Sequence, residues 1–442
     1  MLVHFIKLVT IVVLSVIGHH IRGQNLYFPP KTTPIWDTLT PQDAGWCNDD
    51  FSELYTFLDS TKTKAFIVLQ GGKRVIEAYF DGFKADSAWY WASAGKSLTA
   101  FLVGLAQQQG QLSIEDPVNQ YLNNGWTSCT SQSENLIKIR HQLEMSTGFN
   151  DALGNLNCTT SACLHCIHQP GSSWSYHNAP YTLLRNVLEN ATNQGINLYL
   201  FQQLTQKIGF TGIYAWLPDN LNVFFSTPRS MARFGLLMLA QGVWENDTIM
   251  SDQVFFNQMI NQAQPQNQAY GYLWWLNNTT NYMVPYVPFS IPGNPSPSSP
   301  MDMYSAIGKN SQILNVIPSA DLVVVRLGEN SDTNISVPWN YNEEMMRRLN
   351  DVICHLTTPE HLQTVNEIRI SNQSDKTVHI ESSIHTIKRV RQYDLRGVLV
   401  RESIPPSSRH AQLSQNGIKP GVYILIIEDS QNNLYRKKIH RE

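Results

Sequence analysis

Ser93 and Lys96 are three residues apart in the segment Ser93-Ala94-Gly95-Lys96. If this segment begins a helix, the spacing puts both side chains on one face. A serine hydroxyl is a weak nucleophile until a base removes its proton. A lysine in a poorly solvated cleft, beside the positive end of a helix, has a lowered pKa and can be that base. The pair therefore indicates acyl transfer through a covalent intermediate, and the alternative is a helix capped by Ser93 with a solvated Lys96.

Two later segments carry side chains that suit the same chemistry. In Tyr176-His177-Asn178, a phenol can pass a proton to a leaving group and an amide can orient the lysine and the substrate. The alternative is a helix capped by Asn178 with a packed tyrosine. In Ala306-Ile307-Gly308, a glycine on an edge strand lets a substrate approach the backbone closely. The N–H groups of Ser93 and Lys309 would then form an oxyanion hole.

The surrounding residues predict a mixed domain of helices and strands that positions these groups. Apolar runs at 65–69 and 75–79 flank two glycines and predict a β-hairpin. An apolar stripe at helical spacing predicts a helix from about residue 93 to 109. The remaining pattern predicts helices at 229–239 and 347–355, a strand at 267–276, a proline-rich loop at 285–300, and a second hairpin formed by 313–317 and 322–327.

In this order, the three motifs resemble those of the penicillin-recognising serine hydrolases, most closely the branch of class C β-lactamases and esterases. The segments at 139–148, 170–179, 226–235, 270–272 and 312–326 are similar to connecting segments of that branch. The resemblance covers roughly residues 45–355. It implies an α/β (α+β) fold of the β-lactamase/transpeptidase type, with an antiparallel sheet flanked by helices, a mostly helical lobe, and Ser93 between them.

The same resemblance implies a role for each site residue. Ser93 would be the nucleophile, Lys96 its base, Tyr176 the proton relay to the leaving group, and Asn178 the residue that positions Lys96 and the acyl group. No metal or organic cofactor is implied.

The third motif departs from many members of the group, which begin it with Lys or His to bind a substrate carboxylate. Here that position holds Ala306, and Lys309 follows three residues later. This favours the esterases and amidases of the branch, including those that resemble 6-aminohexanoate-oligomer hydrolases, acting on a small ester, amide or peptide-like substrate. The alternatives are a β-lactamase or D-Ala-D-Ala carboxypeptidase, and a catalytically inactive binding protein on the same fold.

Composition and the N-terminus bear on partners and location. The formal net charge is −3 and 15% of the residues are charged, so no basic surface is expected and a nucleic-acid partner is excluded. Lys7 precedes the apolar run Leu8–Ile17, and Gly23 offers a small residue before a cleavage point. Residues 1–23 are therefore predicted to be a signal peptide. The run is too short to span a bilayer, and no transmembrane segment is expected after cleavage.

The six cysteines suit an exported protein with disulfides. Cys158, Cys163 and Cys166 lie close to His165 and His168, so a zinc site is one interpretation. In an oxidising compartment, closely spaced thiols more often form a bridge. The pair Cys158–Cys163 is therefore predicted as a disulfide, without a metal, and the other pairings stay open.

The composition changes at about residues 357–365, and short strand-like runs separated by glycines follow. Residues 366–442 are predicted to form a small all-β sandwich after a hydrolase domain at 24–356. The segments 393–397, 421–425 and 436–438 resemble the C-terminal sorting domain of type IX secretion substrates. This implies secretion machinery as a partner, and a secreted or cell-surface protein of a Gram-negative bacterium. Without a sorting role, the protein would be periplasmic and the sandwich an accessory binding domain.

Overall fold

The computed structural model describes residues 26–150, 155–218, 221–285, 287, 289–329, 338–354, 356, 368–373, 377–382, 385–394, 399–406, 408–430 and 434–441. The predicted signal peptide at 1–23 and the predicted boundary between residues 356 and 366 lie outside these ranges, apart from Leu356 itself. Within them, no helix is both long enough and apolar enough to cross a membrane.

A six-stranded antiparallel sheet, in the order β2-β1-β13-β12-β11-β8, forms the centre of the main body. Its first four members confirm the two predicted hairpins: β1 (Thr63–Gln70), β2 (Lys73–Tyr79), β12 (Gln312–Ile317) and β13 (Leu322–Gly328). Next to β12 lies β11 (Tyr304–Gly308), and the edge strand on that side is β8 (Trp275–Leu276). β8 pairs only with the start of β11, so Gly308, which was predicted on an edge strand, pairs with β12 alone. Every residue of β12 and β13 is buried, because helices cover both faces of the sheet.

The side chains of β1 alternate between two hydrophobic cores. Ile67 and Leu69 belong to the larger core, together with α2 (Gly95–Gln108) and α9 (Pro228–Leu239). Phe66 and Val68 point to the opposite face and pack with α1 (Ser52–Ser60) and α11 (Pro338–Ile353). This alternation is the period of two that an extended chain imposes.

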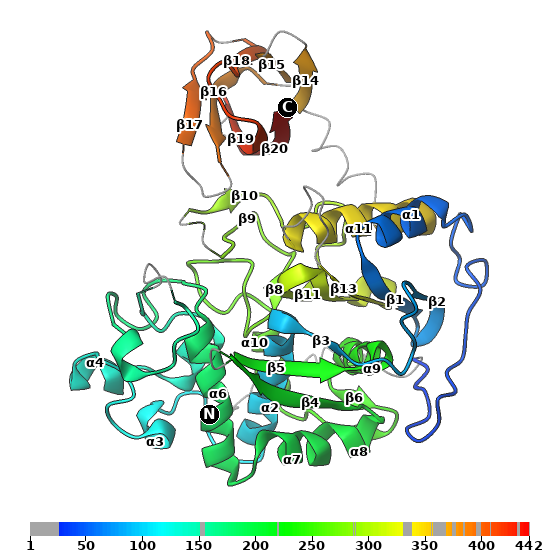
Figure 1. Cartoon of the computed structure of the whole chain (residues 1–442), viewed down its shortest axis with the longest axis vertical. Helices are drawn as coiled ribbons and strands as arrows, with labels where there is room; N and C mark the ends of the chain where they lie inside the picture. Colours follow the sequence, from blue (N-terminus) through cyan, green and yellow to red (C-terminus); the bar gives the residue numbers. More distant parts are fainter. Residues whose placement is uncertain are drawn as a thin grey trace, which may run out of the picture.

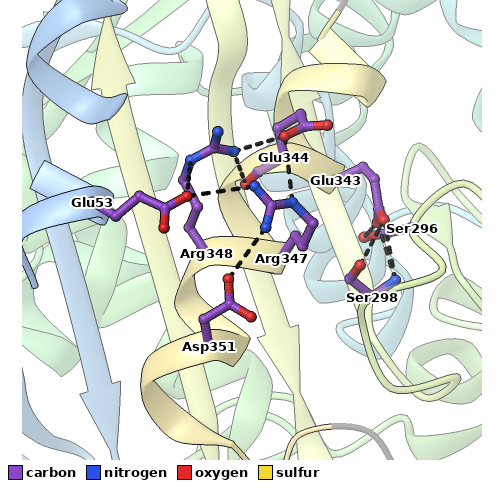
Figure 2. Close-up of polar contacts among 8 residues, drawn as sticks. All are labelled: Glu53, Ser296, Ser298, Glu343, Glu344, Arg347, Arg348 and Asp351. Atoms are coloured by element: carbon purple, nitrogen blue, oxygen red, sulfur yellow. Dashed lines mark hydrogen bonds and ion pairs between the residues drawn. The ribbon is translucent and has the colours of Figure 1, made fainter. Parts of the chain in front are cut away.

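Helices α1 and α11 lie side by side against that second face (Figure 1). Figure 2 shows the ion pairs between them, in which Glu53 lies 3.5 Å from Arg348 and 3.7 Å from Arg347. Within α11, Arg348 pairs with Glu344, and Arg347 pairs with both Glu344 and Asp351. These pairs are largely exposed, so the apolar contacts beneath them carry most of the packing energy.

A helical lobe with a small sheet completes the main body. The lobe comprises α3 (Asn119–Leu122), α4 (Ser131–Asn135), α5 (Ile139–Leu143), α6 (Asn178–Thr192), α7 (Ile196–Leu200), α8 (Gln206–Ile208) and α10 (Gln253–Met259). The small sheet has the order β3-β5-β4, with β3 (Trp89–Tyr90), β4 (Gly212–Leu217) and β5 (Leu221–Ser226). Two-residue strands form the pairs β6 (Val243–Trp244) with β7 (Asp247–Thr248), and β9 (Asn281–Tyr282) with β10 (Ile291–Pro292).

The C-terminal region is an all-β sandwich, as predicted. One sheet has the order β14-β15-β18, with β14 (Ile368–Gln373), β15 (Thr377–Ser382) and β18 (His410–Ser414). The other has the order β17-β16-β19-β20, with β16 (Ile387–Tyr393), β17 (Leu399–Ser403), β19 (Gly421–Asp429) and β20 (Leu434–Arg441). Both sheets contribute to one core, in which Val378 and Leu413 meet Val390 and Leu425. In Figure 1 this sandwich stands beyond β9 and β10.

Three segments differ from their sequence-based predictions. Residues 267–276 form a turn closed by a bridge between Tyr270 and Trp275, and only the last two belong to a strand. Their alternating aromatic side chains are buried on both sides, so the pattern reflects packing and not a half-exposed strand. The hairpin of β4 and β5 was not predicted, and α11 begins well before the predicted residue 347.

All six cysteines form disulfides: Cys47–Cys354, Cys129–Cys166 and Cys158–Cys163. The predicted pair is among them. The zinc interpretation required the thiolates of Cys158, Cys163 and Cys166, and each of these sulfurs is bonded to another sulfur instead.

Candidate active site

Ser93 lies in a 3₁₀ turn, Ala92–Ala94, that leads directly into α2. Its side chain does not cap the helix, contrary to the alternative interpretation. Ala92, the residue before it, has a φ of 48°, which is unfavourable for a residue with a side chain. Buried Trp91 holds the turn against β5, because its backbone N–H donates to Phe224 O and its indole N–H donates to Ser226 Oγ. Strain of this kind persists where the surrounding structure fixes the chain.

Lys96 lies on the first turn of α2 and only 3% of it is exposed. Its Nζ is 2.9 Å from Ser93 Oγ and 2.9 Å from Asn178 Oδ1. The aromatic rings of Tyr181 and Tyr176 lie 4.3 Å and 5.2 Å from Nζ. No carboxylate of the described residues forms an ion pair with it, and burial lowers the pKa of Lys96 to about 7. A large fraction is therefore neutral near pH 7 and able to accept the serine proton.

Asn178 and Tyr176 flank the N-terminus of α6. The imidazole of His177 caps this helix by accepting from Ala179 N, so His177 is structural. The helix start fixes Asn178, whose amide oxygen meets Lys96. Tyr176 precedes the helix, and its ring stacks on Trp275 with centroids 6.0 Å apart.

The aromatic turn at 267–276 thereby serves the site. Tyr270 contacts the ring of Tyr176 edge-on, with centroids 6.3 Å apart, and Trp174 lies at the same distance. Aromatic rings packed on several sides have few orientations available. The cluster consequently holds the Tyr176 phenol beside Lys96.

Asn157 is a site residue that the sequence did not reveal. Its Oδ1 accepts from Asn178 Nδ2 at 2.8 Å, which orients the Asn178 amide so that its oxygen faces Lys96. Asn157 directly precedes Cys158, so the loop that the Cys158–Cys163 disulfide closes begins at the next residue. The sequence showed only that Asn157 lies next to the predicted Cys158–Cys163 disulfide. That position does not say which way the asparagine side chain points.

Gly308 ends β11 next to the nucleophile turn. A Cβ at this position would lie 2.5 Å from Trp91 O and 3.0 Å from Ser93 N. Only a glycine permits this approach, which brings the backbone of Lys309 to the same cavity as Ser93. The predicted substrate-strand residue Ala306 behaves differently, because its side chain is buried in the sheet and does not line the cavity.

Two side chains, those of Arg326 and Gln312, hold the turn after Gly308 in place. Arg326 is fully buried and donates to the carbonyl oxygens of Asn310 and Ser311. Gln312 donates to Lys309 O at 3.3 Å and to Gly328 O at 2.6 Å. The charged donor of Arg326 and the neutral donor of Gln312 thus fix the backbone around Lys309, whose N–H is predicted to bind the oxyanion.

These elements surround one cavity of about 850 Å³. Of the predicted site residues, Ser93, Lys96, Tyr176, Asn178, Gly308 and Lys309 line it. Segments that are far apart in the sequence therefore converge on a buried lysine beside a serine. This arrangement is able to perform nucleophilic acyl transfer without a metal.

The beta-lactamase family model matches residues 59–334. Among curated proteins, an uncharacterized protein of Alkalihalophilus pseudofirmus is 24% identical over 273 residues, which are 54% of this chain and 73% of that protein. A solved Bacillus anthracis structure described as a 6-aminohexanoate-dimer hydrolase superposes with a TM-score of 0.57 at 17% identity, covering 74% of this chain and 90% of its own. A Bacteroides dorei structure described as a beta-lactamase gives 0.55 at 16%, covering 69% and 99%. The two structures show the fold.

Proposed function

Because this chain belongs to the beta-lactamase family, we propose that it is a serine hydrolase that cleaves ester or amide bonds through an acyl-enzyme on Ser93. The observation that carries the proposal is the buried Lys96 Nζ, 2.9 Å from Ser93 Oγ, with a pKa lowered to about 7. The fold that this chain shares with the Bacillus anthracis structure described as a 6-aminohexanoate-dimer hydrolase supports a hydrolase function.

The first half-reaction forms the acyl-enzyme. Neutral Lys96 takes the hydroxyl proton as Ser93 Oγ bonds to the substrate carbonyl carbon. The backbone N–H groups of Ser93 and Lys309 donate hydrogen bonds to the carbonyl oxygen as it becomes negative. When the intermediate collapses, Tyr176 protonates the departing alcohol or amine and regains a proton from the Lys96 ammonium.

The second half-reaction releases the acid. A water molecule attacks the acyl carbon while the Tyr176–Lys96 pair removes its proton, and Ser93 Oγ leaves as the hydroxyl. Asn178 holds Lys96 through both halves, and Asn157 holds Asn178.

Labelling with a fluorophosphonate probe, followed by mass spectrometry of the peptides, tests this proposal. We expect one adduct, on Ser93, and none in Ser93→Ala. The matched control is Ser97→Ala, one helical turn away, because Ser97 is buried and its hydroxyl donates to Leu273 O. An intact, folded protein that takes up neither this probe nor a β-lactam would refute the mechanism and favour a binding protein.

The rival activities are hydrolysis of β-lactams and of D-Ala-D-Ala peptides. Ala306 stands where many such enzymes have a cation, and its side chain is buried. We therefore expect a chromogenic cephalosporin to be a poorer substrate than a nitrophenyl ester. The reverse order of kcat/KM would favour the β-lactamase assignment.

We further propose that the protein is exported, with residues 1–23 as the signal peptide and the C-terminal sandwich as a secretion sorting domain. Three disulfides support an oxidising destination. Fractionation of cells and N-terminal sequencing of the mature protein test this. A protein found in the cytoplasm with Met1 retained would contradict it.

A further inference from the structure

One wall of the cavity is a strip of apolar side chains remote from the catalytic groups in sequence. It consists of Val284, Val287, Phe289 and Ile291. The last three lie in the segment 285–300 that was predicted as a proline-rich loop, and Val284 comes directly before it. Leu217 and Leu221, where β4 and β5 approach one another, add to the apolar lining. With a volume of about 850 Å³, the cavity has room for a group far larger than an acetyl.

The side chains of this wall are held in place by their own small hydrophobic core. Ile291 is buried with Ala269 and Tyr282 in a small core, on which Val284, Val287 and Phe289 pack half-buried. Side chains that pack on a core of their own keep one orientation before any ligand arrives.

Polar side chains anchor both ends of the segment that forms the wall. Before it, the side-chain amide of Asn267 bonds both the N–H and the carbonyl of Met283. After it, half-buried Glu343 of α11 accepts from Ser296 Oγ at 2.9 Å and from Ser298 Oγ at 2.7 Å (Figure 2). The apolar surface is thus preformed.

Charged groups are scarce in the cavity. Among its described lining residues, the charged side chains are those of Lys96, Lys309 and Asp394. Lys96 is engaged with Ser93 and Asn178, and the Lys309 side chain is exposed. A substrate carboxylate inside the cavity would lose water without gaining a buried cation, which is unfavourable. Asparagine side chains supply the neutral polar contacts, Asn157 and Asn222 among them.

We propose that the substrate carries an uncharged, largely apolar group of several carbons next to the bond that is cleaved, and that the wall of Val284, Val287, Phe289 and Ile291 binds this group. The inference rests on the proposed hydrolase function and specifies its substrate class. The C-terminal sandwich takes part, because Tyr393 and Ile424 also line the cavity and the Tyr393 ring lies 5.2 Å from that of Phe289.

The test uses two series of esters with the full-length chain. One series varies the acyl group of p-nitrophenyl esters from acetyl to octanoyl, and the other varies the alcohol of acetate esters. Each buried methylene is worth about fourfold in kcat/KM. We therefore expect a rise of that size per carbon in at least one series, and a loss of more than about tenfold when the chain ends in a carboxylate.

Two variants locate the effect at the wall. Phe289→Ala should reduce kcat/KM by a factor that grows with chain length. Val287→Asp should disfavour long chains more strongly, by putting a charge beside the apolar group. The matched control is Val254→Asp, because Val254 is 70% exposed on α10 and does not line the cavity.

The outcomes separate the two proposals. If no ester is cleaved and Ser93 takes no probe, the hydrolase function itself is wrong. If p-nitrophenyl acetate is cleaved through Ser93 but both series are flat, or the carboxylate-ended esters are preferred, the substrate class is wrong and the exposed Lys309 becomes the candidate for binding an acidic group. A rise with chain length that Phe289→Ala leaves intact would place the apolar group elsewhere in the cavity.

Discussion

Replacing Lys96 by methionine should strongly lower catalysis and remove a destabilising buried charge from the fold. Methionine has a similar length and no charge, so it fills the same buried position. Without the base, kcat/KM should fall by about 10²–10⁴. The stability gain follows from burial, because folding removes the Lys96 ammonium from water without a carboxylate partner among the described residues.

The size of this gain depends on pH in a direction that burial dictates. Lowering the pKa from 10.5 to about 7 makes protonated Lys96 about 5 kcal/mol less stable in the folded than in the unfolded chain. Between these two pKa values the unfolded chain binds more protons, so wild-type stability rises with pH. Below pH 7, buried protonated Lys96 destabilises the fold by nearly the full amount. Near pH 10 this destabilisation is only about 1 kcal/mol. The advantage of Lys96→Met should therefore shrink by roughly 4 kcal/mol from pH 6 to pH 10.

Urea unfolding followed by tryptophan fluorescence measures this difference. All 11 tryptophans precede residue 340, so the signal reports the main body and not the C-terminal sandwich. The variant also loses the hydrogen bonds of Lys96 to Ser93 and Asn178, which lowers its stability equally at both pH values. This loss cancels when the difference from wild type at pH 6 is compared with that at pH 10. Lys84→Met is the control, because Lys84 is exposed and should give no such trend. A difference between wild type and Lys96→Met that is the same at pH 6 and pH 10 would refute the argument that burial lowers this pKa.

Four further results are expected. In wild type, kcat/KM should rise about tenfold per pH unit below pH 7 and level off above it, since neutral Lys96 is the base; a profile flat from pH 5 to 9 would contradict this. Tyr176→Phe should lower kcat by about 10² for anilides but much less for p-nitrophenyl esters, whose leaving group needs no proton; equal losses would argue against a relay. Asn157→Ala should lower kcat about tenfold, whereas Asn157→Asp keeps the acceptor and shifts the pH profile upward by raising the pKa of Lys96. Removing the Cys158–Cys163 disulfide by a double alanine substitution should lower kcat in the same direction as Asn157→Ala; an unchanged kcat would show that the loop is fixed without it.

The sequence by itself predicted which side chains would form the candidate site, and it predicted much of the framework that carries them. The spacing of Ser93 and Lys96 at a helix start is a local geometric fact, because residues three apart in a helix share a face. The first hairpin of the main sheet was predicted from apolar runs around two glycines and the second from β-branched runs around a turn, and the structure confirms both. Gly308 was predicted to let a substrate approach the backbone, whereas the close approach that the structure shows is to the chain's own turn, at Trp91 O.

Only the tertiary structure decided how these groups work together. The pKa of Lys96 depends on burial by Tyr176 and Tyr181, which are distant in sequence and pack on it only in the fold. The direction of the Asn157 side chain is set by an irregular loop, where no periodicity relates sequence to orientation. The prolines of residues 285–300 predicted only a loop. The apolar wall of Val284, Val287, Phe289 and Ile291 could not be predicted, because these side chains pack on a small core assembled from separate segments. Periodic patterns report which face of an element is buried, but a cavity is formed by the contacts between elements.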